Sequence, residues 1–186
     1  MDAGLAAVLG ALAGAVATTG AAFATGWSAR EQAKITARAE HRRQRRDARQ
    51  AVYEELINAV EMLIEATRSV DLGVTASRAN QEQSYFIPDM KEVKSLEKSV
   101  RKIATKVTLA GPASISEMVE ELRGIARSLA ANLIRIEMGI EFPGIPEHKE
   151  GWLLAEADRV ALYRAVAEFA AGAQAILDDD GTRGSP

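Results

Sequence analysis

Apolar residues recur three and four positions apart along most of the chain after residue 50, which is the spacing of helices that bury one face. Four such segments are predicted: the end of a long helix that runs to about residue 70, and helices over about 88–110, 114–140 and 152–178. No stretch shows the sustained alternation that is typical of a strand. Because four stripes of similar length can bury one another, the sequence predicts an all-α protein with an antiparallel four-helix bundle over residues 51–178.

The segment 88–110 has the most regular spacing. Its apolar residues follow at intervals of three and four without a break: Val93, Leu96, Val100, Ile103 and Val107. This spacing is typical of a coiled-coil helix that packs nearly parallel to its neighbours. Pro88 is expected in the first helical turn, and Ser114 with Glu117 has the spacing of a capping box for the next helix. The last helix is expected to follow a turn over 141–151 and to bury Leu154, Ala161, Leu162, Ala165, Phe169 and Ile176.

The N-terminal segment is uncharged from Ala3 to Trp27. As a helix of 25 residues it would be ~37 Å long, enough to cross a hydrocarbon core of roughly 30 Å. Its strongly apolar residues contribute only about −3 kcal/mol to insertion, so a lone helix would be marginal. We expect a transmembrane-like helix over residues 1–29. A cleaved signal peptide and a helix buried in a soluble assembly are the alternatives.

Small residues recur at every fourth position of this segment. On a helix they would form one groove along which a second backbone can approach closely, as in small-xxx-small pairs inside membranes. The residues predicted for this helix–helix interface are Ala6, Gly10, Gly14, Thr18, Ala22 and Gly26. The sequence thus predicts a homo-oligomer through the N-terminal helix, although a segment so rich in alanine and glycine also produces such spacings by chance.

A basic stretch follows directly. Residues 30–50 hold eight basic and three acidic residues, whereas residues 51–186 hold 15 basic and 22 acidic ones. We expect a juxtamembrane helical stalk over 30–50 whose basic residues contact anionic lipid: Arg30, Lys34, Arg38, Arg42, Arg43, Arg45 and Arg46. The positive-inside rule then places the N-terminus outside the cell membrane and the bundle in the cytoplasm, as a single-pass protein. Nucleic acid is a less favoured partner, because the stretch lacks aromatic residues and the rest of the chain is acidic.

The residues that usually carry chemistry are sparse. The chain has no cysteine, and its two histidines, His41 and His148, lack the glutamate three residues earlier that a di-metal bundle site needs. Phosphate-binding loops, nucleophile elbows and dinucleotide fingerprints are missing from the sequence. We therefore expect a protein that is not an enzyme, with no catalytic residues, no metal site and no cofactor.

Three smaller predictions concern the bundle. Asp158 lies close to the apolar face of the last helix and is expected to pair with an arginine or lysine. Asp178 to Asp180 are expected to contact the region of residues 42–49, because an up-down-up-down topology returns the chain there. Tyr85, Phe86 and Ile87, which precede Pro88, are expected to fold back on the following helix as a hydrophobic staple. Alternatively, Tyr85 and Phe86 form an exposed docking patch with Phe142 and Ile145 at the far end of the bundle. Residues 179–186 are expected to form a disordered acidic and glycine-containing tail.

Together these features favour a membrane-anchored scaffold or regulator that works by self-association and by binding an unidentified protein partner. Two alternatives stay open. The first is a membrane-permeabilising effector whose small-residue helix assembles into a pore, and the second is a structural subunit of a larger soluble helical assembly. The alanine- and arginine-rich composition is typical of a bacterium with GC-rich DNA.

Overall fold

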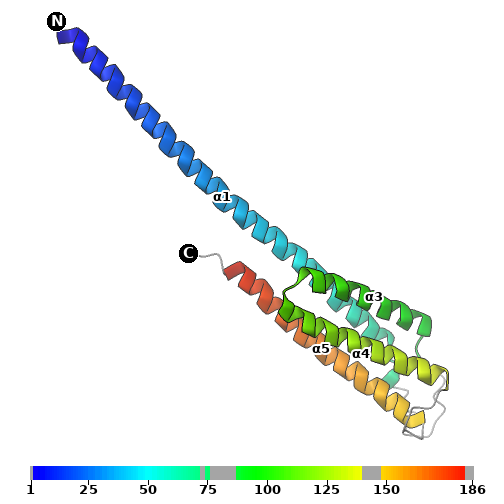
Figure 1. The fold of residues 1–186 in the computed structure, drawn as a ribbon. Coiled ribbons are helices and arrows are strands. Elements are labelled where there is room, and N and C mark those ends of the chain that lie inside the picture. Colours follow the sequence, from blue (N-terminus) through cyan, green and yellow to red (C-terminus); the bar gives the residue numbers. More distant parts are fainter. Residues whose placement is uncertain (1, 72–73, 76–86, 140–147, 183–186) are drawn as a thin grey trace. The chain divides into compact units, whose positions relative to one another are not determined.

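The computed structural model of the chain describes residues 2–71, 74–75, 87–139 and 148–182, and for 2–26, 148–150 and 180–182 the backbone alone. Every element among these residues is helical (Figure 1). The helices are α1 (Asp2–Ala66), α3 (Met90–Ala110), α4 (Ala113–Glu137) and α5 (His148–Thr182). The predicted all-α class is therefore confirmed. The chain divides into two compact units, residues 1–45 and 46–186, which we describe separately.

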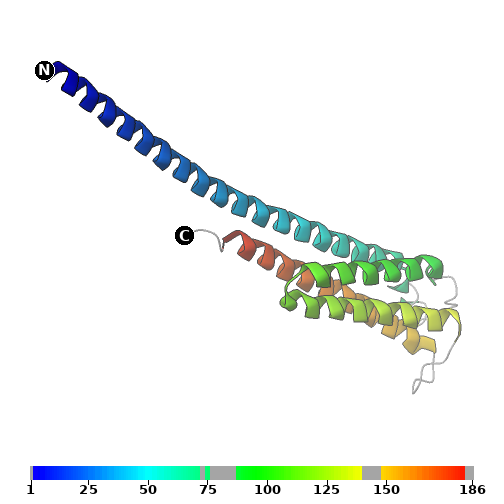
Figure 2. The same cartoon turned by 45° about the horizontal axis from the view of Figure 1, so that its top comes forward.

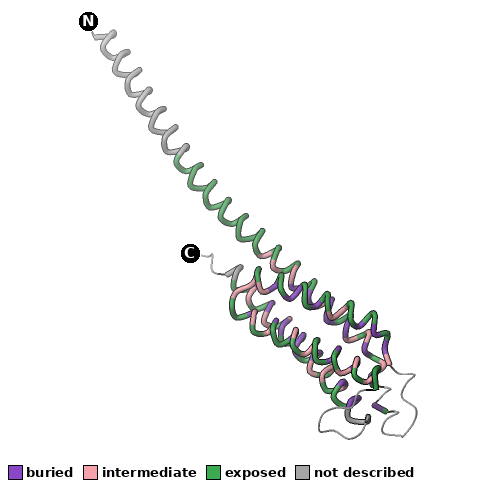
Figure 3. Tube along the Cα trace, turned by 45° about the vertical axis from the view of Figure 1, so that its right-hand side comes forward, coloured by how far each residue is buried: buried purple, intermediate pink, exposed green. Residues whose placement is uncertain are grey.

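The first unit consists of the N-terminal part of α1. Its backbone is helical from Asp2 onwards, as the uncharged segment and the basic stretch predict. From Trp27 to Arg45 every side chain is exposed (Figure 3). A helical stalk that has no neighbouring helix in its own unit is expected to expose its side chains in this way.

The second unit is a bundle of four helices: the C-terminal part of α1, α3, α4 and α5. They lie side by side and alternate in direction along the chain (Figures 1 and 2). One continuous apolar core holds them together, with residues of every helix fully buried, among them Leu56, Val100, Leu122 and Phe169. Tyr53 of α1 packs edge-on against Phe169 of α5, with ring centroids 5.8 Å apart and an interplanar angle of 84°. The predicted four-helix bundle is confirmed.

The helix boundaries differ from the predictions by a few residues. α3 begins at Met90, and Asp89 is its N-cap, whose side chain accepts a hydrogen bond from the Lys91 N–H. Pro88 therefore lies before the helix. α4 begins at Ala113 after Pro112, which has no side-chain hydrogen bond to offer. The predicted capping box at Ser114 is wrong, since Ser114 is already the second residue of the helix.

The last helix is longer than predicted at both ends. α5 begins at His148, inside the expected turn, and extends to Thr182, into the expected tail. Its buried face is centred on Leu162, Ala165 and Phe169, as predicted, but Leu154 is exposed rather than buried.

The α3–α4 corner is tightly packed. A Cβ on Gly111 would lie 2.4 Å from Cγ2 of Ile115 and 3.1 Å from the Tyr53 hydroxyl, so only glycine fits there without a shift. Arg49 of α1 donates from Nε to the carbonyl oxygen of Ala110, at 3.0 Å, and so holds the corner against α1. At the same end of the bundle, Arg46 lies 3.8 Å from the carboxylate of Asp178. The predicted contact between Asp178 and the 42–49 region is confirmed by this pair.

One helix is long and apolar enough to cross a membrane among the residues whose side chains are described. It is the part of α5 from Gly151 to Asp179, and a third (33%) of its most apolar window is buried in the bundle. This is weak support for a span, because the buried third supplies core residues of the bundle such as Phe169. The side chains of the N-terminal segment lie outside the described residues, so the span predicted there stays a prediction.

Candidate interaction surfaces

The six small residues predicted to form a helix–helix interface all lie in the helical backbone of α1. They are Ala6, Gly10, Gly14, Thr18, Ala22 and Gly26, and their side chains lie outside the described residues. A spacing of four on a continuous helix places them along one slowly turning face. The structure thus contains the helix on which the groove was predicted. The groove itself stays a prediction.

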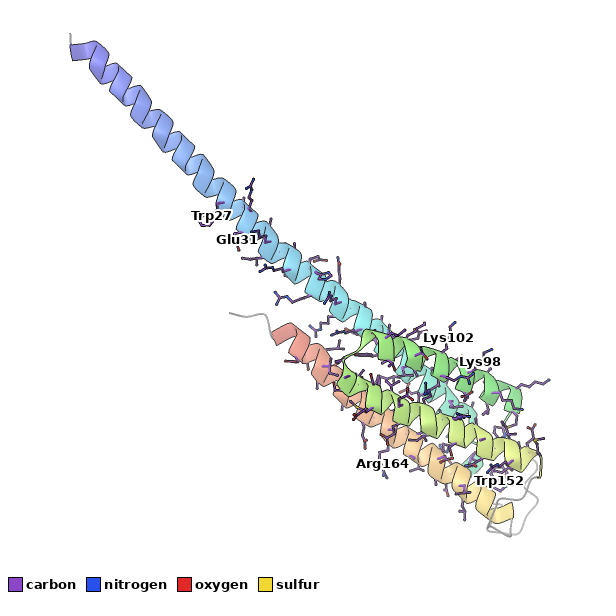
Figure 4. The ribbon with its side chains drawn as sticks, viewed as in Figure 1. Trp27, Glu31, Lys98, Lys102, Trp152 and Arg164 are labelled. Carbon is purple, nitrogen blue, oxygen red and sulfur yellow. The ribbon has the colours of Figure 1, made fainter. Side chains whose placement is uncertain are left out.

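The seven basic residues predicted to contact anionic lipid also lie on α1. Arg30, Lys34, Arg38, Arg42, Arg43 and Arg45 are exposed, whereas Arg46 is half-buried in the second unit against Asp178. Arg46 therefore belongs to the bundle rather than to the stalk. Within the stalk, Lys34 forms an exposed ion pair with Glu31, with 3.6 Å between Nζ and Oε2. Trp27, which is 77% exposed, precedes this basic stretch (Figure 4).

The predicted docking patch cannot be placed. Tyr85, Phe86, Phe142 and Ile145 all lie outside the described residues. His148 is the first residue of α5, and its side chain is likewise not described. His41 is exposed on α1. Within the described part of the chain, no group of three or more histidine, aspartate or glutamate residues is arranged to hold a metal ion.

Asp158 is half-buried between α4 and α5, as predicted, but its partners are neutral. Its Oδ2 accepts hydrogen bonds from the Ser128 hydroxyl and from the Asn132 amide, both at 2.8 Å. The expectation of a basic partner is wrong for these contacts. The neighbouring Arg159 instead pairs with Asp71, beyond the end of α1. These polar groups join helices inside the bundle, and their mutual hydrogen bonds account for their position.

A basic stripe on α3 escaped the sequence analysis. Five exposed residues follow at spacings of one, three and four and lie on one side of the helix: Lys91, Lys94, Lys98, Arg101 and Lys102. Figure 4 shows Lys98 and Lys102 directed away from the other helices of the bundle. The spacing was visible in the sequence. Charged residues at this spacing are also normal on the solvated face of any amphipathic helix, so the sequence alone does not single them out.

A second apolar face of α5 also escaped the sequence analysis. Leu153, Val160 and Tyr163 are 42%, 49% and 68% exposed, although they belong to the same helix as the buried Leu162 and Phe169. A helix with apolar residues on opposite sides is usually covered on both. The two faces are hard to separate in the sequence because alanines lie on each of them.

Comparisons of the chain with models of protein families, with curated proteins and with solved structures found no match. The surfaces described above are therefore the basis on which a function can be argued.

Proposed function

We propose that the protein is a non-enzymatic, single-pass membrane-anchored helical bundle that acts by self-association and partner binding, as a scaffold or regulator. The observation that carries this proposal is the order of residues on α1. An uncharged helix of about seven turns leads through Trp27 directly into an exposed basic stretch. Aromatic residues and basic clusters in this order are typical of the cytoplasmic boundary of a membrane helix.

The basic residues nearest the uncharged segment supply the electrostatic part of the anchor. Arg30, Lys34 and Arg38 are exposed and within about 12 Å of one another along the helix axis. Each basic residue close to an anionic surface contributes about 1 kcal/mol, and the effect fades within roughly a Debye length. Because the uncharged segment is only weakly apolar, this contribution and packing against a second helix would both support insertion.

Fractionation tests the anchor. The full-length protein should sediment with membranes and resist extraction by carbonate, whereas a chain that begins at Ser28 should stay in the supernatant. Release of the full-length protein into buffer without detergent would refute the anchor and favour a subunit of a soluble assembly. Protection of an N-terminal tag from protease added to the cytoplasmic side would support the proposed orientation.

A double substitution tests the proposed helix–helix groove. Gly10→Leu with Gly14→Leu fills the groove, so cross-links between the N-terminal helices of two copies in membranes should be lost while membrane sedimentation persists. Val8→Phe with Leu12→Phe, on the opposite side of the same helix, is the control and should leave these cross-links intact. Dye release from vesicles by the wild-type protein, abolished by the chain that begins at Ser28, would instead favour the pore-forming alternative.

A further inference from the structure

The exposed side of α5 carries a second regular stripe of residues. Its members follow at intervals of four, three, four, three and four, which is coiled-coil spacing. They are Leu153, Ala157, Val160, Arg164, Ala167 and Ala171, and all of them are exposed. We call these six residues the outer stripe. The buried residues of α5, including Leu162 and Phe169, lie on the opposite side of the helix and pack into the bundle.

The composition of the outer stripe is unusual for a surface that stays in water. Five of its six residues are apolar, and Arg164 is the one charged member. The exposed Tyr163, next to the stripe, extends its apolar area. Solvent-facing sides of bundle helices are normally rich in charged residues, so a stripe of this kind indicates a contact with another molecule.

The sizes of the residues along the outer stripe indicate which kind of molecule makes this contact. The larger side chains, Leu153, Val160 and Arg164, are in its first two thirds, whereas its last two positions are both alanine. In an antiparallel pair of identical helices centred between residues 165 and 166, two of the larger residues of one copy would face alanines of the other, whereas Leu153 would face Asp178. Val160 would lie opposite Ala171 of the second copy, and Arg164 opposite Ala167. In a parallel pair each residue would face its own copy, so the larger residues would face one another and the alanines would face alanines.

The charges favour the same arrangement. When Arg164 lies opposite Ala167 of the second copy, the adjacent residue of that copy is the exposed Glu168, on the same side of the contact. By symmetry the pairing occurs twice. Figure 4 shows Arg164 directed away from the bundle, as this contact requires. Opposite charges that meet twice across a two-fold axis set the register of a helix pair.

We propose that the outer stripe of α5 is a homodimer interface, in which α5 of one copy packs antiparallel against α5 of a second copy. The alanines let the helices approach closely, near the lower end of the 8–10 Å range for helix pairs. The inference adds a second contact to the self-association of the proposed function and rests on it for its biological context. Because Arg46 lies beside Asp178 in each copy, the antiparallel pair places the Arg46 ends of the two bundles at opposite ends of the dimer. The copies joined through α5 therefore differ from those joined through the N-terminal helix. The contact itself involves the bundle alone and does not depend on lipid.

Exchanging the charges of Arg164 and Glu168 tests the register of the proposed α5 pair. Full-length protein carrying Gly10→Leu and Gly14→Leu, purified in mild detergent, should still form dimers in sedimentation velocity, because these substitutions remove only the N-terminal contact. Adding Arg164→Glu alone, or Glu168→Arg alone, should lower the dimerisation affinity about tenfold or more, since like charges then meet twice. The combination Arg164→Glu with Glu168→Arg should restore the affinity to within about threefold of the unexchanged protein. Failure of the double exchange to restore dimers would overturn the proposed pairing.

Cross-linking tests the direction of the helices, and the absence of cysteine from the chain makes it specific. In the proposed pair the two copies of residue 167 are about 5 Å apart along the helix axis, whereas the two copies of residue 153 are about 38 Å apart. Ala167→Cys should therefore be joined by a short thiol-specific cross-linker, and Leu153→Cys should not. Equal cross-linking at both positions would show a parallel pair and refute the proposal.

The two experiments also separate this inference from the proposed function. Cross-linking at residue 167 in a protein that is released into buffer without detergent would support the α5 contact while refuting the membrane anchor. Sedimentation with membranes, together with a monomeric bundle in the Gly10→Leu, Gly14→Leu background, would support the anchor and overturn the α5 contact. Both exchanged residues are exposed, so circular dichroism should show unchanged helix content in every variant.

Discussion

Single residues in the bundle are constrained most strongly where helices meet. Gly111 is one such position, because the side chains of Ile115 and Tyr53 occupy the space that a Cβ would need. Gly124, in the middle of α4, has nothing within 4 Å of the place where its Cβ would be. The two glycines therefore have opposite roles, although the sequence alone does not distinguish them.

Replacing each glycine by alanine should separate these roles. Gly111→Ala should lower the free energy of unfolding by about 1–3 kcal/mol, because Ile115 and the corner must shift. Gly124→Ala is the matched control and should raise it by about 0.5–1 kcal/mol, since alanine favours the helix. Urea unfolding followed by circular dichroism measures both. A Gly111→Ala variant as stable as the wild type would show that the corner is looser than its distances indicate.

Asp158 is constrained by the two donors that share its Oδ2. Asp158→Ala removes the acceptor for Ser128 and Asn132 and should cost about 1–3 kcal/mol of unfolding free energy. Asp158→Asn keeps one oxygen acceptor and should lose less than half as much. Equal losses in the two variants would mean that the negative charge, rather than the shared oxygen, stabilises this contact.

At the scale of elements, a side-chain cap marks the start of α3 but not of α4, and apolar spacing decides which side of a helix is buried. Asp89 caps α3 by accepting the Lys91 N–H at 2.8 Å, while Pro112 leaves α4 without a side-chain cap. The 3-4-3-4 spacing of α3 correctly predicted its buried residues Val93, Val100, Ile103 and Val107. Boundaries were harder to predict because several residues near each end can act as caps, and tertiary contacts choose among them.

The cap of α3 can be tested by substitution. Asp89→Ala should lower the free energy of unfolding by about 1 kcal/mol, because the Lys91 N–H loses its acceptor. Asp89→Ser offers another oxygen to the same N–H and should lower it by only a few tenths of that amount. Thermal unfolding of the full-length protein in mild detergent measures the difference in stability between the two variants. An alanine variant that melts like the serine variant would contradict the assigned cap.

At the scale of the whole molecule, the buried residues of the described chain all lie between Tyr53 and Leu177. Residues 27–45, the part of the first unit whose side chains are described, contribute none of the core, and this exposed stalk has its own charge pattern. Folding of the bundle and attachment to a membrane are therefore expected to be separable properties of this chain.

Truncation tests this separation. A chain that begins at Glu40 keeps the second unit whole, so its unfolding should stay cooperative and its free energy should change by no more than about 1 kcal/mol. The same truncation should abolish sedimentation with membranes. Loss of the cooperative transition would show that the N-terminal part of α1 takes part in the fold of the bundle.

The sequence by itself determined the helical class, the number of bundle helices, the buried face of α3 and the contact between Asp178 and the end of the basic stretch. These follow from periodicity and charge, which act locally or through a simple topology. Only the tertiary structure decided that Asp158 binds Ser128 and Asn132, that Gly111 lies against Tyr53, and that α5 has a second, exposed apolar side. The first two depend on which helix faces which, because neighbours in space come from distant parts of the chain. The second side of α5 does have a regular spacing in the sequence, but only the packing of the bundle shows which of the two sides is buried.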